Sequence, residues 1–170
     1  MKRIIISVAI GLILNAFAFA QGHTFNNVNT EYTFDLPEDA WKMVVTPTAS
    51  SPNVEYVYID RVEGHLEIRK ISIGETEIIS DLIKREQEQK LQFLPGFVAG
   101  KEERFAGNYK GGVFNFEFVR GGKNMSGRYY FLRANDSTVY ILKFDGYREK
   151  LISIRNQTDS IARTFKLKDK

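Results

Sequence analysis

The stretch VFNFEFVR, residues 113–120, decides the fold. Its three phenylalanines fall on one face of an extended chain, because side chains alternate between the two faces of a β-strand. The next two predicted strands, 125–133 and 138–144, carry large apolar residues on both faces. A sheet with one face in water would alternate apolar and polar residues. The centre of this sheet is therefore expected to be covered on both sides.

Turn residues separate these strands at the spacing typical of β-hairpins. A further strand is predicted at 101–106, and Gly111-Gly112 lie between it and residues 113–120. Gly121-Gly122 and Asn135-Asp136 divide the remaining strands. The region 101–144 is therefore predicted to be an antiparallel meander.

Downstream of the meander, one stripe of residues recurs at steps of four and three, the period of an amphipathic helix. It comprises Tyr147, Leu151, Ile154, Thr158, Ile161 and Phe165. We expect this helix to lie on the meander, with Asp145 capping its first turn. Four residues between the stripe positions are expected to face water: Arg148, Lys150, Arg155 and Asp159. Residues 168–170 are expected to fray.

Upstream of the meander, strands are predicted at Tyr32–Leu36 and Trp41–Val45, followed by a loop at 46–53. A hairpin is predicted from 54–61 and 65–73, joined at Val62-Glu63-Gly64. A helix is predicted between this hairpin and Pro95-Gly96. Its apolar face comprises Ile78, Ile79, Leu82, Ile83, Leu91 and Leu94, with Glu86 and Gln87 interrupting the middle.

These elements predict an α+β fold in which a single three-layer domain has an antiparallel meander sheet covered by a helix on each face. The expected organisation is a signal peptide at 1–20, a polar lead-in at 21–30, the domain at 31–167 and a frayed tail at 168–170.

The first twenty residues predict export. Lys2 and Arg3 precede a short apolar run from Ile4 to Leu14, and Ala18-Phe19-Ala20 forms a small-x-small cleavage site. The apolar run is shorter than the about 20 residues that a transmembrane helix needs. The sequence therefore predicts a periplasmic or extracellular protein cleaved after Ala20, with no integral membrane insertion after cleavage.

The composition narrows the function classes. The chain has 170 residues and a formal charge of +3, which falls to about +1 once Lys2 and Arg3 leave with the signal peptide. This charge gives no electrostatic case for nucleic acid as a partner. The chain has no cysteine, so disulfides, thiolate metal sites and a lipid-modified cysteine are excluded. The oligomeric state stays open.

Three segments resemble the PsbP-like superfamily. They are the entry from Tyr32 to Trp41, which runs strand, proline, turn and tryptophan; the late strand 137–144; and the ending from Ile161 to Leu167. The superfamily includes extrinsic photosystem II subunits, a Ran-binding nuclear import factor and small exported bacterial proteins. The resemblance implies an antiparallel sheet between helices and an accessory or binding role. It transfers no functional residues, because the matching positions are core and turn residues.

No catalytic constellation stands out. His65 and Glu67 alternate on one strand face and could bind a metal, but two ligands are too few for a site. No Gly-x-Ser-x-Gly elbow and no phosphate-binding glycine loop occurs. We therefore expect no catalytic, cofactor-binding or metal-binding residues. A hydrolase that uses His65 and Glu67 remains an alternative, and it requires a third ligand or acid near His65.

The sequence favours a non-enzymatic accessory or protein-binding domain of the cell envelope, whose partner is another envelope protein. The expected contact surface is the first hairpin with loop 46–53, through Tyr56, Tyr58, His65, Glu67 and Arg69. The alternative is a carrier of a small apolar ligand or lipid. That function requires a pocket of at least about 300 Å³ between sheet and helix with convergent polar groups.

Overall fold

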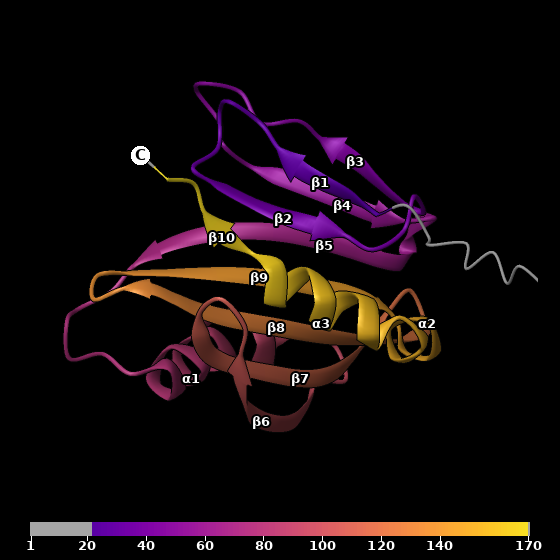
Figure 1. Ribbon diagram of the computed structural model, residues 1–170. Helices are drawn as coiled ribbons and strands as arrows, with labels where there is room; N and C mark the ends of the chain where they lie inside the picture. Colours follow the sequence, from indigo (N-terminus) through magenta and orange to yellow (C-terminus); the bar gives the residue numbers. More distant parts are fainter. Residues whose placement is uncertain (1–21, 170) are drawn as a thin grey trace, which may run out of the picture.

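The computed structural model describes residues 22–169, and the predicted signal peptide and its cleavage site lie outside them. The strands and helices follow one another along the chain as Figure 1 shows. They are β1 (His23–Asn26), β2 (Tyr32–Leu36), β3 (Trp41–Val45), β4 (Val54–Tyr58), β5 (Asp60–Ser72), α1 (Ile79–Gln89), the 3₁₀ turn Leu91–Phe93, β6 (Val98–Ala106), β7 (Lys110–Arg120), β8 (Lys123–Asn135), β9 (Thr138–Tyr147), α2 (Arg148–Ser153), α3 (Arg155–Thr164) and β10 (Lys166–Leu167).

The main sheet is antiparallel and has seven strands in the order β3-β4-β5-β9-β8-β7-β6. Strands β6 to β9 are neighbours in chain order, so the predicted meander is confirmed. Its first turn is at 107–109, however, and the predicted turn residues Gly111 and Gly112 lie inside β7, where they pair with β8. Strand β5 joins the N-terminal hairpin to this meander by pairing with β9, which places Lys70 directly opposite Tyr140. With its few helices, the chain has the predicted α+β class.

A second, three-stranded sheet has the order β1-β2-β10. Figure 1 shows β1 and β2 close to β4 and β5, and β10 leading away from the end of α3. The predicted polar lead-in 21–30 contains the strand β1. Phe25 of this strand points into the core and is 3% exposed. The tail is tied down at its start, since the backbone N–H of Lys168 donates to the carbonyl of Glu31 at 2.9 Å.

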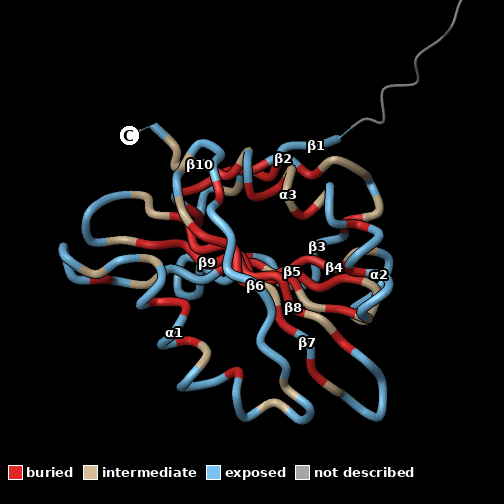
Figure 2. Tube along the Cα trace, turned by 90° about the horizontal axis from the view of Figure 1, so that it is seen from below, coloured by how far each residue is buried: buried red, intermediate tan, exposed pale blue. Residues whose placement is uncertain are grey.

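Two apolar cores lie on opposite faces of the main sheet, and Figure 2 shows buried residues running along its central strands. The predicted facing of the meander is confirmed. One core contains Phe114, Phe116, Phe118, Tyr129, Phe131, Val139 and Ile141, together with Leu82 and Ile83 of α1. The other contains Tyr130, Leu132, Tyr140, Leu142 and Phe144, together with the small sheet, Ile154, and Ile161 of α3.

The first hairpin turns earlier than predicted. The turn is at Ile59, which has a φ of 62°, and β5 begins at Asp60. The Asp60 carboxylate accepts hydrogen bonds from the backbone N–H groups of Val62 and Glu63 at 2.8 and 2.9 Å. The predicted turn, which included Gly64, therefore lies inside β5. A Cβ at Gly64 would lie 2.9 Å from Ile154 Cδ1, so this glycine permits a close approach rather than a turn.

The C-terminal helix is divided into α2 and α3 at Ile154, where the backbone leaves the helical region with φ −97° and ψ 14°. Asp145 does not cap α2, because it lies within β9, and the N-cap residue Tyr147 makes no side-chain cap bond. Asp159, predicted to face water, accepts from Arg128 Nη2 at 2.8 Å. The other three residues predicted to face water are exposed.

Helix α1 is shorter than predicted, and its buried face is shifted along the chain. Ile78 precedes the helix and is 58% exposed. Glu86, which interrupted the predicted apolar stripe, is buried with Leu82 and Ile83. Glu86 can be buried because its carboxylate forms an ion pair with Lys143 of the main sheet.

Strand β6 forms one edge of the main sheet and is exposed along all of its length except Phe105. Its pairing with β7 shifts register between Ala99 and Glu102. A run of charged residues, 101–104, follows this irregularity. Charge and irregular register are common devices on unpaired strand edges, because they disfavour the addition of another strand.

Candidate functional site

The five residues predicted as a contact surface are divided between the two faces of the main sheet. Tyr56 lies opposite Leu66 and is 3% exposed in the core beneath the small sheet. Tyr58 lies on the same face, where Gln157 Nε2 donates to its hydroxyl at 3.4 Å. His65, Glu67 and Arg69 alternate onto the opposite face, so the predicted surface is not continuous.

His65 is buried between two carboxylates. Its Nε2 lies 2.8 Å from Glu55 Oε2, and its Nδ1 lies 3.7 Å from Asp145 Oδ2. Burial by itself lowers the pKa of His65, but its hydrogen bonds with Asp145 and Glu55 outweigh burial and nearby Arg61, so that the pKa is raised. This arrangement links β4, β5 and β9, because each strand supplies one of the three side chains.

We expect His65 to make the free energy of unfolding depend on pH. A histidine whose pKa is raised in the folded state stabilises the fold fully below its unfolded pKa of about 6.5. That contribution is lost as pH rises through the folded pKa. Urea unfolding of the wild type and of His65→Gln between acid and alkaline pH measures the effect. The stability difference between the two proteins should shrink with rising pH, and a difference independent of pH would contradict this assignment.

The acid that the hydrolase alternative requires near His65 is present, since Glu55 and Asp145 lie 2.8 and 3.7 Å from its ring nitrogens, but the predicted partner Glu67 is not bonded to His65. Glu67 accepts instead from Arg69 Nε at 2.6 Å. Among residues 22–169, no group of three or more histidine, aspartate or glutamate side chains is placed to hold a metal ion. The His65 side chain is only 7% exposed, so a substrate has little access to it.

A second buried charged pair links α1 to the sheet. Lys143 Nζ donates to Glu86 Oε1 at 2.5 Å, and Lys90 Nζ donates to Glu86 Oε2 at 2.6 Å. Burial alone raises the pKa of Glu86, but these two hydrogen bonds outweigh it and leave the pKa below its ordinary value. A sequence signal for this pair exists: Glu86 and Lys143 both occupy positions that periodicity assigns to the core.

A third buried polar group lies under α3. Arg128 donates to the Tyr130 hydroxyl at 2.6 Å, to Asn115 at 2.6 Å and to Asp159 at 2.8 Å. Tyr130 also contacts Thr158 Oγ1 at 2.9 Å. These bonds satisfy groups that burial would otherwise make costly. The network therefore holds α3 against the sheet.

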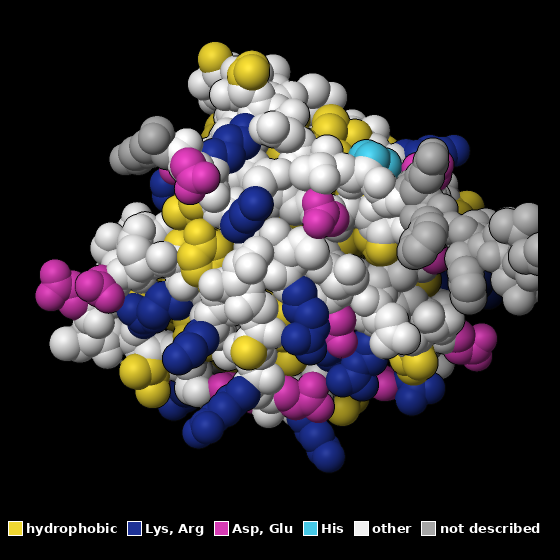
Figure 3. Space-filling model, in the orientation of Figure 1, with side chains coloured by type: hydrophobic (Ala, Val, Ile, Leu, Met, Phe, Trp, Pro, Cys, Tyr) yellow, Lys and Arg dark blue, Asp and Glu magenta, His cyan; other side chains and the backbone are white. Residues whose placement is uncertain are grey.

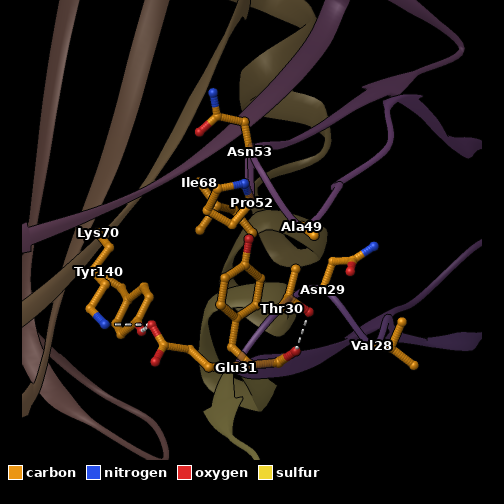
Figure 4. Close-up of a pocket in the computed structure, with 11 residues that line it drawn as sticks. Val28, Asn29, Thr30, Glu31, Ala49, Pro52, Asn53, Ile68, Lys70 and Tyr140 are labelled. Carbon is orange, nitrogen blue, oxygen red and sulfur yellow. Dashed lines mark hydrogen bonds and ion pairs between the residues drawn. The ribbon is translucent and has the colours of Figure 1, made fainter.

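The best candidate for a binding site is a pocket of about 630 Å³ at the end of the two sheets, which Figure 4 shows. The turn before β2, loop 46–53, β5 and β9 surround it. Its residues are Val28, Asn29, Thr30, Glu31, Tyr32, Ala49, Pro52, Asn53, Ile68, Lys70 and Tyr140. This pocket thus lies between the two sheets, whereas a wider hollow of about 890 Å³ lies between the start of α1 and strands β6 to β8.

An ion pair lies at one side of this pocket. Lys70 Nζ donates to Glu31 Oε1 at 2.6 Å, and the Tyr140 hydroxyl donates to the same carboxylate. Opposite them, Asn29 Nδ2 donates to the Pro47 carbonyl at 3.1 Å and joins the turn before β2 to loop 46–53. The residues that line the pocket are therefore of two kinds: apolar or aromatic side chains, and polar or charged side chains. Sequence reasoning included loop 46–53 but missed Glu31, Tyr32, Lys70 and Tyr140.

The surface charges do not form a patch of one sign on the face seen in Figure 3, where basic and acidic side chains are interspersed. No helix within residues 22–169 is long and apolar enough to cross a membrane.

The fold is that of the PsbP-like proteins, as the resemblance implied. PsbP from the cyanobacterium Synechocystis has a TM-score of 0.58 and 12% identity, covering 90% of this chain and 96% of that one. LpqN of Mycobacterium tuberculosis, described as involved in cell envelope biogenesis, has a TM-score of 0.58 and 14% identity, covering 88% of this chain and 91% of that one.

A putative regulator of unknown function from Pseudomonas aeruginosa has a TM-score of 0.55 and 15% identity, covering 88% of this chain and 99% of that one. Neither a scan of known protein families nor a search of curated proteins finds a match. At these identities the similarity establishes the fold alone.

Proposed function

We propose that this chain is an exported, non-enzymatic binding domain of the cell envelope that acts as an accessory to another envelope protein. The charged segment, apolar run and small-x-small site at residues 1–20 support export. The fold shared with PsbP and with a protein of envelope biogenesis agrees with an accessory role.

A non-enzymatic role is supported mainly by one observation: the buried ionisable side chains form hydrogen bonds and ion pairs with neighbouring side chains. His65, Glu86, Arg128 and Lys143 are buried, and each is bonded to a neighbouring side chain. A catalytic acid or base must instead reach a substrate through a cleft. These pairs stabilise the packing of sheet and helices.

The partner surface that we propose is the exposed side of β5 around Glu67 and Arg69; loop 46–53 lines the pocket on the other face of the sheet and is not part of this surface. Arg69 is exposed and Glu67 is half-buried, whereas Tyr56 is excluded by its burial. Interfaces of this kind combine a few large side chains with charged residues at the rim.

Site-specific photocrosslinking in intact cells tests this surface. A photoreactive residue at Arg69 should give an adduct with an envelope protein, while the same residue at Lys84, exposed on α1, should give none. Mass spectrometry of the mature chain should also find Gln21 at its N-terminus. Equal adducts at both positions, or none at either, would contradict the proposed surface.

We also propose that the domain has three layers, with the main sheet in the middle and a layer that contains a helix on each of its faces. The division of α1 and α3 between the two cores supports it. The small sheet shares the second face with α3, so that layer is a mixture of strands and helix.

A second candidate function is that of a small-ligand carrier, which the pocket between the two sheets favours. Its volume of about 630 Å³ lies in the range of small-molecule sites, about 300–1,000 Å³. Its polar residues do not suit the purely apolar ligand that the sequence suggested.

A further inference from the structure

The pocket between the two sheets has an apolar floor and a polar rim. Ile68 and Tyr140 are 4% and 1% exposed and form part of the floor. Figure 4 shows Glu31 reaching toward Lys70, with Asn29 and Asn53 on other sides of the pocket. The rim therefore offers both hydrogen-bond donors and acceptors, since amides supply both and the carboxylate accepts.

Tyr32 adds an unsatisfied group to the wall of this pocket. It is 5% exposed, and its hydroxyl is buried with no hydrogen-bond partner among the described residues. Burial raises the pKa of Tyr32, so the hydroxyl stays protonated and able to donate. A buried hydroxyl without a partner destabilises the folded state, and a ligand that supplies an acceptor recovers this free energy.

We propose that this pocket binds a neutral sugar, such as one or two rings of an envelope glycan. A sugar ring has an apolar face that can pack on the floor, and its hydroxyl groups both donate and accept hydrogen bonds at the rim. The inference rests on the proposed binding role and names the ligand class for it.

Other ligand classes fit the lining less well. An acyl chain would leave the rim's polar groups without partners, which is costly. An anion would meet only Lys70 as a cation among the lining residues, and Glu31 already neutralises this lysine at 2.6 Å. A neutral polyhydroxylated ring avoids both costs.

Because the Tyr32 hydroxyl is buried, our proposal requires loop 46–53 to shift before a ligand can reach this hydroxyl. This loop supplies Ala49, Pro52 and Asn53 to the pocket, and its Thr48 and Ser51 bond to each other across a tight turn. A bound sugar should therefore hold the loop in the shifted position while accepting a hydrogen bond from Tyr32.

Isothermal titration calorimetry of the mature chain, residues 21–170, tests the proposal. The probes are cellobiose, maltose and N,N′-diacetylchitobiose, with decanoate and inorganic phosphate as the apolar and anionic comparisons. At least one disaccharide should bind with millimolar or tighter affinity. Tyr32→Phe should weaken that binding about tenfold, because it removes one hydrogen bond to the ligand.

Tyr56→Phe is the matched control. Tyr56 is 3% exposed in the same aromatic core but does not line the pocket. Removal of its hydroxyl group should therefore leave the affinity for the sugar unchanged. Tyr32→Phe should not lower the thermal midpoint, since it removes an unsatisfied hydroxyl. Absence of binding by all three disaccharides, binding of decanoate alone, or equal weakening by both variants would overturn the proposal. A crosslinked partner at Arg69 in the absence of sugar binding would leave the proposed function intact.

Discussion

Ile154→Asp is expected to abolish cooperative folding. Ile154 is 4% exposed in the core between the main sheet and α3, and its Cδ1 lies against the backbone at Gly64. A carboxylate there would be buried without a partner, and the cost of burying an unpaired charge exceeds the total stability of about 5–15 kcal/mol of a typical domain. Circular dichroism during urea unfolding should show no sigmoidal transition.

Ile152→Asp is the matched control for this change. Ile152 lies two residues away in α2 but is 60% exposed, so the same substitution should change stability by less than about 0.5 kcal/mol. A soluble Ile154→Asp variant that unfolds cooperatively would show that Ile154 is not buried against the sheet.

Phe116→Ala is expected to lower the free energy of unfolding by about 3–5 kcal/mol. Phe116 is 2% exposed, and its ring lies directly over Gly127 of the neighbouring strand, where a Cβ would come within 2.1 Å of it. Neighbouring backbone cannot readily collapse into the space that the ring leaves. Trp41→Ala should cost a similar amount, because Trp41 is equally buried and donates to Gln157 Oε1 at 2.8 Å.

Phe93→Ala controls for the loss of an aromatic ring. Phe93 is 73% exposed, so its removal should leave the midpoint of chemical denaturation nearly unchanged. An unchanged midpoint for Phe116→Ala would mean that the facing of β7 is wrong.

The meander could be predicted because its information is local. Side chains two residues apart share a face, and glycine and asparagine mark the turns, so β7, β8 and β9 follow from the chain itself. The turn at Ile59 could not be predicted in this way. A β-branched residue at positive φ is unusual, and Asp60 stabilises that turn through backbone hydrogen bonds that leave no periodic signal.

The candidate site was harder to predict than the fold. Tyr32, Lys70 and Tyr140 lie far apart in the sequence, and the pairing of β5 with β9 and the position of the small sheet bring them together. Sequence reasoning selects the hairpin face because His65 and Glu67, two residues apart on a strand, share one side of it. Periodicity shows which residues share a face, but it does not show that Glu55 and Asp145 surround the histidine.

The pairing of β10 with β2 has a consequence for the order in which the chain folds. It places Leu167 opposite Tyr32, so the small sheet closes only when the last residues are present. Contacts between such distant segments form slowly, because a long loop must be closed first. A chain emerging from the ribosome therefore cannot complete the small sheet until residues 166 and 167 have been synthesised.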